Sequence, residues 1–159
     1  MKIAVRGIVP CDLTAVRRAM HAAARPYGLP SGTVVTLAFV GDDEMRALNR
    51  RYRRADRTTD VLSFGERVAF RDRGTAAARR LAADPDGVTR LGDVVISAAR
   101  AARQARRRRK PLGAEIAFLA AHGVLHLLGF DDETAAGYRE MVALGTAATR
   151  STRPRPTKR

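Results

Sequence analysis

Two histidines, His122 and His126, stand four residues apart in an apolar stretch towards the C-terminal end of the chain. On a helix, four residues make about 1.1 turns, so both imidazoles would point from one face, about 6 Å apart along the axis. Gly129 follows where a helix can end in a left-handed cap, and the chain would then bring Asp131 or Asp132 back towards the rings. Two histidines and one carboxylate make a three-ligand site with an open position for water, which is typical of catalytic zinc.

The surroundings of this pair strengthen the expectation of a metal, although the spacing alone is common by chance. The chain has only three histidines, and two of them belong to the pair. Their neighbours are Ala, Leu, Val and Gly, so an unpaired polar ring buried there would be costly, and ligation is one way to satisfy it. We therefore predict a Zn²⁺ site of His122, His126 and either Asp131 or Asp132. Another divalent metal would also suit it, because the third ligand is an aspartate.

A folded core must hold the helix that carries the pair, and the remaining pattern predicts one. Apolar runs predict strands at Lys2–Val9, Gly32–Val40, Asp60–Phe64 and Leu91–Ile96. Helices are predicted from Asp12 or Thr14 to Ala24, from Gly41 onward, after an N-cap at Ser97, from Pro111 through the histidines, and over 134–149. This order predicts an α+β fold in a single domain, with a mixed sheet of about four strands flanked by helices.

The end of the chain and one internal region have less regular patterns. The final helix is expected to turn Tyr138, Met141, Val142 and Leu144 inward, so that the domain spans residues 1–149. Residues 150–159 contain five basic side chains and no acidic one, and we expect a disordered basic tail there. Residues 65–90 are interpreted as an irregular insertion with a short helix over Thr75–Ala83, and their role is left open.

Composition narrows the class of partner and the compartment. The net charge is +14, from 30 Lys and Arg against 16 Asp and Glu, which favours an anionic partner such as nucleic acid. Aromatic residues make up only 5%, which argues against a base-stacking platform of the RNA-recognition-motif type. A single cysteine excludes an internal disulfide and suits a reducing compartment. No apolar run is long enough for a membrane span and no secretory pattern is present, so we expect a cytoplasmic protein without a membrane partner.

Several segments together resemble the YbeY family of bacterial metal-dependent endoribonucleases. The stretch 122–132 is similar to the family's His-Gly-x-Leu-His-Leu-x-Gly-Tyr-Asp-His motif. Leu48-Asn49 with Tyr52-Arg53, then Thr59–Phe64, then Leu91–Ser97 each resemble a further family motif and occur in the family's order. The resemblance covers roughly residues 32–145, with one departure in the metal motif: the family's third ligand is a histidine, and Asp132 stands at the matching position.

The resemblance implies hydrolytic cleavage within single-stranded RNA, with a role in 16S rRNA 3′-end maturation and ribosome quality control and with the ribosome as partner. Arg53 matches the family's functional arginine, and its guanidinium would hold the scissile phosphate and offset charge in the transition state. A metal at the triad would lower the pKa of a water or polarise a phosphoryl oxygen. Asp131 would either orient a ligand ring or act as a turn residue. Further candidates for RNA binding are Arg54, Arg106, Arg107, Arg108, Arg109 and Lys110.

Three other functions stay open on the sequence. A metalloprotease of the metzincin type would place its general base, a glutamate, directly after the first histidine, and that residue here is Gly123. A non-catalytic RNA- or ribosome-binding factor could use the metal only to stabilise its fold. A family member altered at Asp132 could bind RNA without cutting it. Removal of the metal separates the second function from an enzyme, since a structural site loses folding and a catalytic site loses activity.

Overall fold

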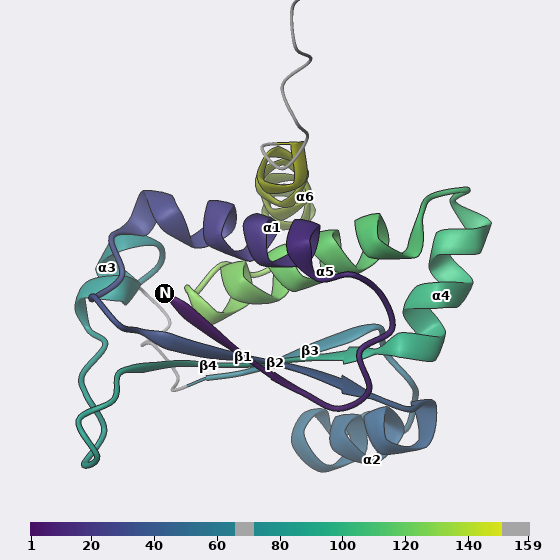
Figure 1. Cartoon of the computed structure of the whole chain (residues 1–159), viewed down its shortest axis with the longest axis horizontal. Coiled ribbons are helices and arrows are strands. Elements are labelled where there is room, and N and C mark those ends of the chain that lie inside the picture. The colour runs from purple at the N-terminus through teal and green to yellow at the C-terminus, as the bar shows by residue number, and fades with distance from the viewer. Residues whose placement is uncertain (66–71, 151–159) are drawn as a thin grey trace, which may run out of the picture.

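The computed structural model describes residues 1–65 and 72–150, in which helices and strands alternate along most of the chain (Figure 1). The strands are β1 (Lys2–Arg6), β2 (Val34–Val40), β3 (Val61–Phe64) and β4 (Arg90–Ser97). The helices are α1 (Thr14–Ala24), the 3₁₀ turn η1 (Arg25–Tyr27), α2 (Asp42–Arg53), α3 (Thr75–Arg79), α4 (Ala98–Arg107), α5 (Leu112–Leu127) and α6 (Ala135–Arg150).

The strands form one mixed sheet in the order β1-β2-β4-β3. β1, β2 and β4 run parallel, and β3 pairs with β4 in the antiparallel direction at one edge. The central strands β2 and β4 are rich in Val, Ile, Leu and Phe, as expected for strands covered on both faces. The predicted α+β fold with a mixed four-stranded sheet is therefore confirmed.

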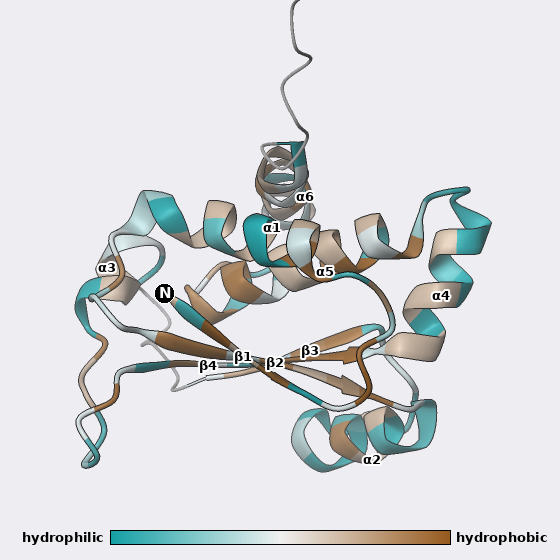
Figure 2. Cartoon of the chain, viewed as in Figure 1, coloured by the Kyte–Doolittle hydropathy of each residue, from teal (hydrophilic) through white to brown (hydrophobic). Residues whose placement is uncertain are grey.

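Helices cover the sheet unequally. α1, α5 and α6 lie over one face, and α2 covers the other (Figure 1). α5 packs on β3 and β4 below and on α1 and α6 around it, which is why its sequence is apolar on nearly all sides. In Figure 2 the strands are mostly coloured as apolar, and hydrophilic colour is frequent on α2 and α4. The histidine pair therefore sits on the most deeply buried helix of the described chain.

Some predicted boundaries and one predicted core residue were wrong. The first strand ends at Arg6 instead of Val9, because Gly7 turns the chain with φ +83° and leaves Val9 45% exposed. Tyr138 was predicted to face inward but is 57% exposed, whereas Met141 is fully buried as predicted. Arg150, assigned to the tail, is the last residue of α6. The rest of the predicted tail, 151–159, lies outside the described residues, as do residues 66–71 of the irregular insertion.

Other predicted features are present. Ser97 caps α4, since its hydroxyl accepts a hydrogen bond from the Arg100 amide at 3.2 Å. The short helix predicted within Thr75–Ala83 is α3. In residues 1–65 and 72–150, none of the helices combines the length and the apolar character needed to cross a membrane.

Candidate metal centre and its cleft

The structure brings His122, His126 and Asp132 together. Nε2 of His122 lies 3.3 Å from Oδ2 of Asp132, and Nε2 of His126 lies 3.7 Å from the same oxygen. The ligand atoms of all three side chains lie within 4.8 Å of one another. Tetrahedral ligands about 2.1 Å from a zinc ion are roughly 3.4 Å apart, so these separations fit a single ion held by three side chains.

The two rings have different surroundings. Nδ1 of His126 lies 3.0 Å from the Phe130 carbonyl oxygen, and a hydrogen bond donated there leaves the lone pair on Nε2, which faces Asp132. Burial, followed by the nearby His122, lowers the pKa of His126, so its ring is neutral and able to ligate at neutral pH. Nδ1 of His122 is buried without a hydrogen-bond partner among the described residues. Nε2 is the nitrogen of His122 that faces Asp132, so a metal would be held through Nε2 and Nδ1 would carry the ring proton.

A glycine in the left-handed backbone conformation turns the chain after α5 and brings Asp132 to the rings. Gly129 has φ +84°, and α5 ends in a Schellman motif: the Phe130 amide donates to the Leu125 carbonyl at 3.1 Å and the Gly129 amide to the His126 carbonyl at 3.0 Å. A Cβ at position 129 would collide with the Asp72 carbonyl, so this residue must be a glycine for steric as well as conformational reasons.

Residues 72–74 support the same loop from outside. The Gly74 amide donates to the Leu128 carbonyl at 2.8 Å, and the Arg73 guanidinium lies over the Phe130 ring, 5.5 Å from its centroid. Arg73 also pairs with Glu140 of α6 at 2.8 Å. The end of the irregular insertion therefore helps to hold the turn after α5 that carries Asp132.

Gly123 sets the distance between α5 and the sheet. A Cβ at this position would lie 2.5 Å from Cγ1 of Val94 and 3.2 Å from the Ser63 hydroxyl. The Ser63 hydroxyl donates to the Gly123 carbonyl at 3.1 Å. Position 123 therefore faces β3 and β4, where a metzincin-type glutamate base would have no room.

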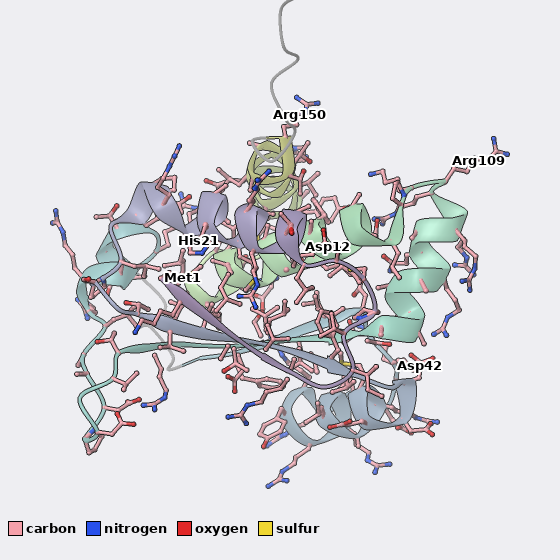
Figure 3. The ribbon with its side chains drawn as sticks, in the orientation of Figure 1. Met1, Asp12, His21, Asp42, Arg109 and Arg150 are labelled. Carbon is pink, nitrogen blue, oxygen red and sulfur yellow. The ribbon has the colours of Figure 1, made fainter. Side chains whose placement is uncertain are left out.

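The triad of His122, His126 and Asp132 opens into a cleft of about 1530 Å³. Arg53, the last residue of α2, lines it and is close enough to His126 for its charge to help lower the pKa of that ring. Among the other predicted cationic residues, Arg108 and Lys110 line the cleft. Arg54, Arg106, Arg107 and Arg109 are exposed and are not part of the lining, and Figure 3 shows Arg109 extending away from the end of α4.

Three further cationic residues also line this cleft. They are Arg57, in the loop between α2 and β3, Arg100, on α4, and Arg150, at the end of α6. Asn49, which is 4% exposed, donates to the Arg57 carbonyl at 2.7 Å and so fixes the path of that loop. The asparagine of the Leu-Asn motif could have indicated a structural role, but nothing in the sequence singles out Arg57 among so many arginines.

Comparisons with known proteins cover most of the chain. A sequence profile described as endoribonuclease YbeY matches residues 12–152. The chain belongs to the YbeY family. It is 44% identical to the endoribonuclease YbeY of Moorella thermoacetica over 82% of this chain and 80% of that protein. It is 39% identical to that of Geobacillus kaustophilus, over 83% and 81% of the respective lengths.

The fold agrees with this membership. The solution structure of a Thermotoga maritima protein superposes with a TM-score of 0.58 and covers 99% of both chains at 20% identity, which shows a shared fold. The motifs that resemble the YbeY family occupy α2, β3, β4 and the end of α5, and residues from α2, β3 and α5 line the cleft. The resemblance noted in the sequence is therefore confirmed.

Asp131 has a different position from Asp132. Its carboxylate accepts a hydrogen bond from the Glu133 amide at 3.3 Å, which is the geometry of a turn residue. The ring of His126 is oriented by the Phe130 carbonyl instead. A main-chain carbonyl exists at every position, so no side-chain pattern of the YbeY family could have indicated this partner.

Proposed function

We propose that this member of the YbeY family is a metal-dependent endoribonuclease that cleaves within single-stranded RNA. The observation that carries the proposal is the position of the His122, His126 and Asp132 triad in a cleft that Arg53 also lines. A divalent metal bound by two imidazoles and one carboxylate supplies Lewis-acid chemistry towards a phosphoryl oxygen or a water. Zn²⁺ is the metal we propose, since nitrogen ligands and the separations of the triad suit it.

The cleft residues account for substrate binding. The guanidinium of Arg53 holds a phosphate through two hydrogen bonds and offsets the negative charge that grows on it during cleavage. Arg57, Arg100, Arg108 and Lys110 attract the adjoining phosphates. The side chain of Arg108 is held in place because it donates at 2.8 Å to Glu115, whose carboxylate is 1% exposed.

The recessed site favours a single strand over a duplex. The side chain of His122 is only 10% exposed and that of His126 23%, so a scissile phosphate must enter the cleft to reach them. A flexible single strand can bend inward, whereas a rigid A-form duplex keeps its phosphates on a convex surface. By family membership, we propose 16S rRNA as the natural substrate, with roles in 3′-end maturation and ribosome quality control in the cytoplasm.

One competing function is that of an RNA- or ribosome-binding factor that does not cut and whose metal only stabilises the fold. The position of the site argues against this, because α5 is already held by β3, β4, α1 and α6, and Asp132 is 39% exposed at the cleft. The fold of the described chain therefore has a core that does not depend on the metal.

The experiment compares one labelled RNA as a single strand and as a duplex, with the protein loaded with Zn²⁺ or treated with a chelator. We expect internal cleavage of the single strand only, lost with the chelator and in His126→Ala. Arg53→Ala should lower kcat/KM by roughly 10²- to 10³-fold, as for other groups that stabilise charge in the transition state. Arg109→Ala, whose side chain lies outside the cleft lining, is the matched control and should cleave normally. Tight binding without cleavage by the zinc-loaded wild type would favour the non-catalytic factor.

A further inference from the structure

Tyr138 is an exposed aromatic residue on α6, shortly after the turn that carries Asp132. Its side chain is 57% exposed and lines the same cleft as the triad, and it follows Asp132 by six positions. The backbone around it is closely fixed, because the Tyr138 amide donates to the Thr134 carbonyl at 2.8 Å and a Cβ on Gly137 would lie 2.5 Å from the Asp131 carbonyl oxygen. The backbone that carries the ring is therefore fixed relative to the segment of Asp131 and Asp132.

The cleft has walls of different chemistry. Phe118 from α5 and Tyr138 and Val142 from α6 form an apolar wall. Most of the cations come from other elements, with Arg53 and Arg57 at the end of α2 and in the loop after it, and α6 contributes one at its last residue, Arg150. α6 and α2 lie on opposite sides of the sheet in Figure 1, so the apolar and cationic walls have separate origins.

A single RNA strand suits this division. Proteins bind single strands by pairing a cationic groove for the phosphates with aromatic rings on which the bases stack. We propose that Tyr138 is a substrate-positioning residue whose ring stacks on one nucleobase next to the scissile phosphate. This role rests on the proposed endoribonuclease function and adds a contact to a base, which the triad and the arginines do not supply. A single ring tolerates every base, so the contact would fix position without selecting a sequence.

Tyr52 provides a comparison within the chain. It is exposed to almost the same extent, 54%, but its ring packs edge-on against Phe64 with 5.0 Å between centroids. It is not part of the cleft lining. No aromatic ring packs against Tyr138 among the described residues, so its face is free to receive a base. Tyr52→Ala is therefore a matched control for the loss of an exposed tyrosine.

The experiment uses the zinc-loaded full chain and a series of single-stranded RNAs in which one nucleotide at a time around the cut is abasic. For the wild type, we expect KM to rise roughly tenfold at one abasic position, the size expected for loss of one stacked base. Tyr138→Ala should raise KM for the intact strand by a similar factor with kcat nearly unchanged. In this variant, the abasic substitution at that position should no longer raise KM further. Tyr138→Phe should restore the wild-type pattern, and Tyr52→Ala should keep it.

Each other outcome has a defined meaning. If Tyr138→Ala keeps the wild-type abasic profile and KM, the stacking contact does not exist, while the endoribonuclease function stands. If the wild type binds the strands but does not cut them, fluorescence anisotropy with the same abasic series reads the contact, and only the proposed catalysis fails. If the wild type neither binds nor cuts single-stranded RNA, both proposals are overturned.

Discussion

The hydroxyl of Ser63 donates a hydrogen bond to the main-chain carbonyl of Gly123, with 3.1 Å between the two oxygens. The bond joins β3 to α5 one residue after His122. It forms because Gly123 lets the helix approach the sheet so closely that a Cβ at this position would collide with the side chain of Val94. The depth of the histidine pair in the molecule is therefore set by a glycine and a serine that have no role in ligation.

Gly123→Ala should destabilise the fold, since the new methyl group would lie 2.5 Å from Cγ1 of Val94. Overpacking of this kind costs about 1–3 kcal/mol. Urea denaturation of the wild type and the variant measures the loss. Gly113→Ala is the control on the same helix, because its nearest neighbour would be Sγ of Cys11 at 3.9 Å, and it should be neutral or slightly stabilising. Equal stability of Gly123→Ala and the wild type would contradict the close packing described above.

Asp132→His should tighten zinc binding, because it replaces a carboxylate by the nitrogen ligand that the family motif contains. Asp132→Ala should weaken binding, and His126→Ala should remove it. Elemental analysis of purified protein, followed by competition with a chelator, gives the stoichiometry and affinity. We expect about one metal ion per chain in the wild type, as three ligands around one open position imply. Wild-type affinity in Asp132→Ala would exclude this aspartate as a ligand.

Arg57→Ala should reduce the salt dependence of RNA binding, because this arginine lines the cleft. Each phosphate contact with a single strand contributes a slope of about −0.7 to log K against log salt concentration, so the loss of one contact should lower the slope by about that amount. Filter binding at several salt concentrations measures it. Arg109→Ala removes the same charge from outside the cleft lining and should leave the slope almost unchanged. Identical slopes for the two variants would mean that the cleft is not the RNA path.

Asp42→Asn should lower stability at neutral pH but much less in acid. The Ser97 hydroxyl donates to the Asp42 carboxylate at 2.7 Å and Arg103 pairs with it at 2.6 Å, and these contacts hold the pKa of Asp42 below its usual value. A lowered folded-state pKa gives stability that is present above the unfolded value, about 3.9, and is lost as the pH falls through the folded value.

We expect the free energy of unfolding of Asp42→Asn to be about 1 kcal/mol lower than that of the wild type at pH 7, which is the usual size for a hydrogen-bonded charge at a helix start. The free energies of unfolding of the two proteins should converge as the pH falls below the ordinary aspartate pKa. Denaturant titrations at a series of pH values follow the difference. A deficit that stays constant with pH would show that the Asp42 charge contributes nothing.

The sequence was sufficient for features that depend on local rules. The four-residue spacing of the histidines and the glycine after them predicted the helix, its left-handed end and the return of Asp131 or Asp132, because each depends on neighbouring residues only. The choice of Asp132 came from the resemblance to the YbeY family. Ser97 as an N-cap was predictable for the same reason. The four-stranded mixed sheet also followed from the pattern of segments, although the strand order and the antiparallel direction of β3 did not.

Features that depend on distant parts of the chain were not predictable. Periodicity placed Tyr138 on the inner face of the last helix, but the first turns of α6 project past the core and leave it at the cleft. Arg57 reaches the cleft only because the loop after α2 lies at its border. Among adjacent cations such as Arg108 and Arg109, the direction of each side chain depends on how the helix end is capped, and Arg109 has φ +50°.

The contacts of residues 72–74 set a limit for any attempt to shorten the protein. Asp72 lies against Gly129, and Gly74 bonds to Leu128, so an excision between β3 and β4 that removed these residues would take away the outer support of the Schellman turn. It would also remove the ion pair between Arg73 and Glu140, which joins this segment to α6 on the other side of Asp132. A minimal version of this domain should therefore be trimmed after position 80, in the segment that leads to β4, and should keep residues 72–74 intact.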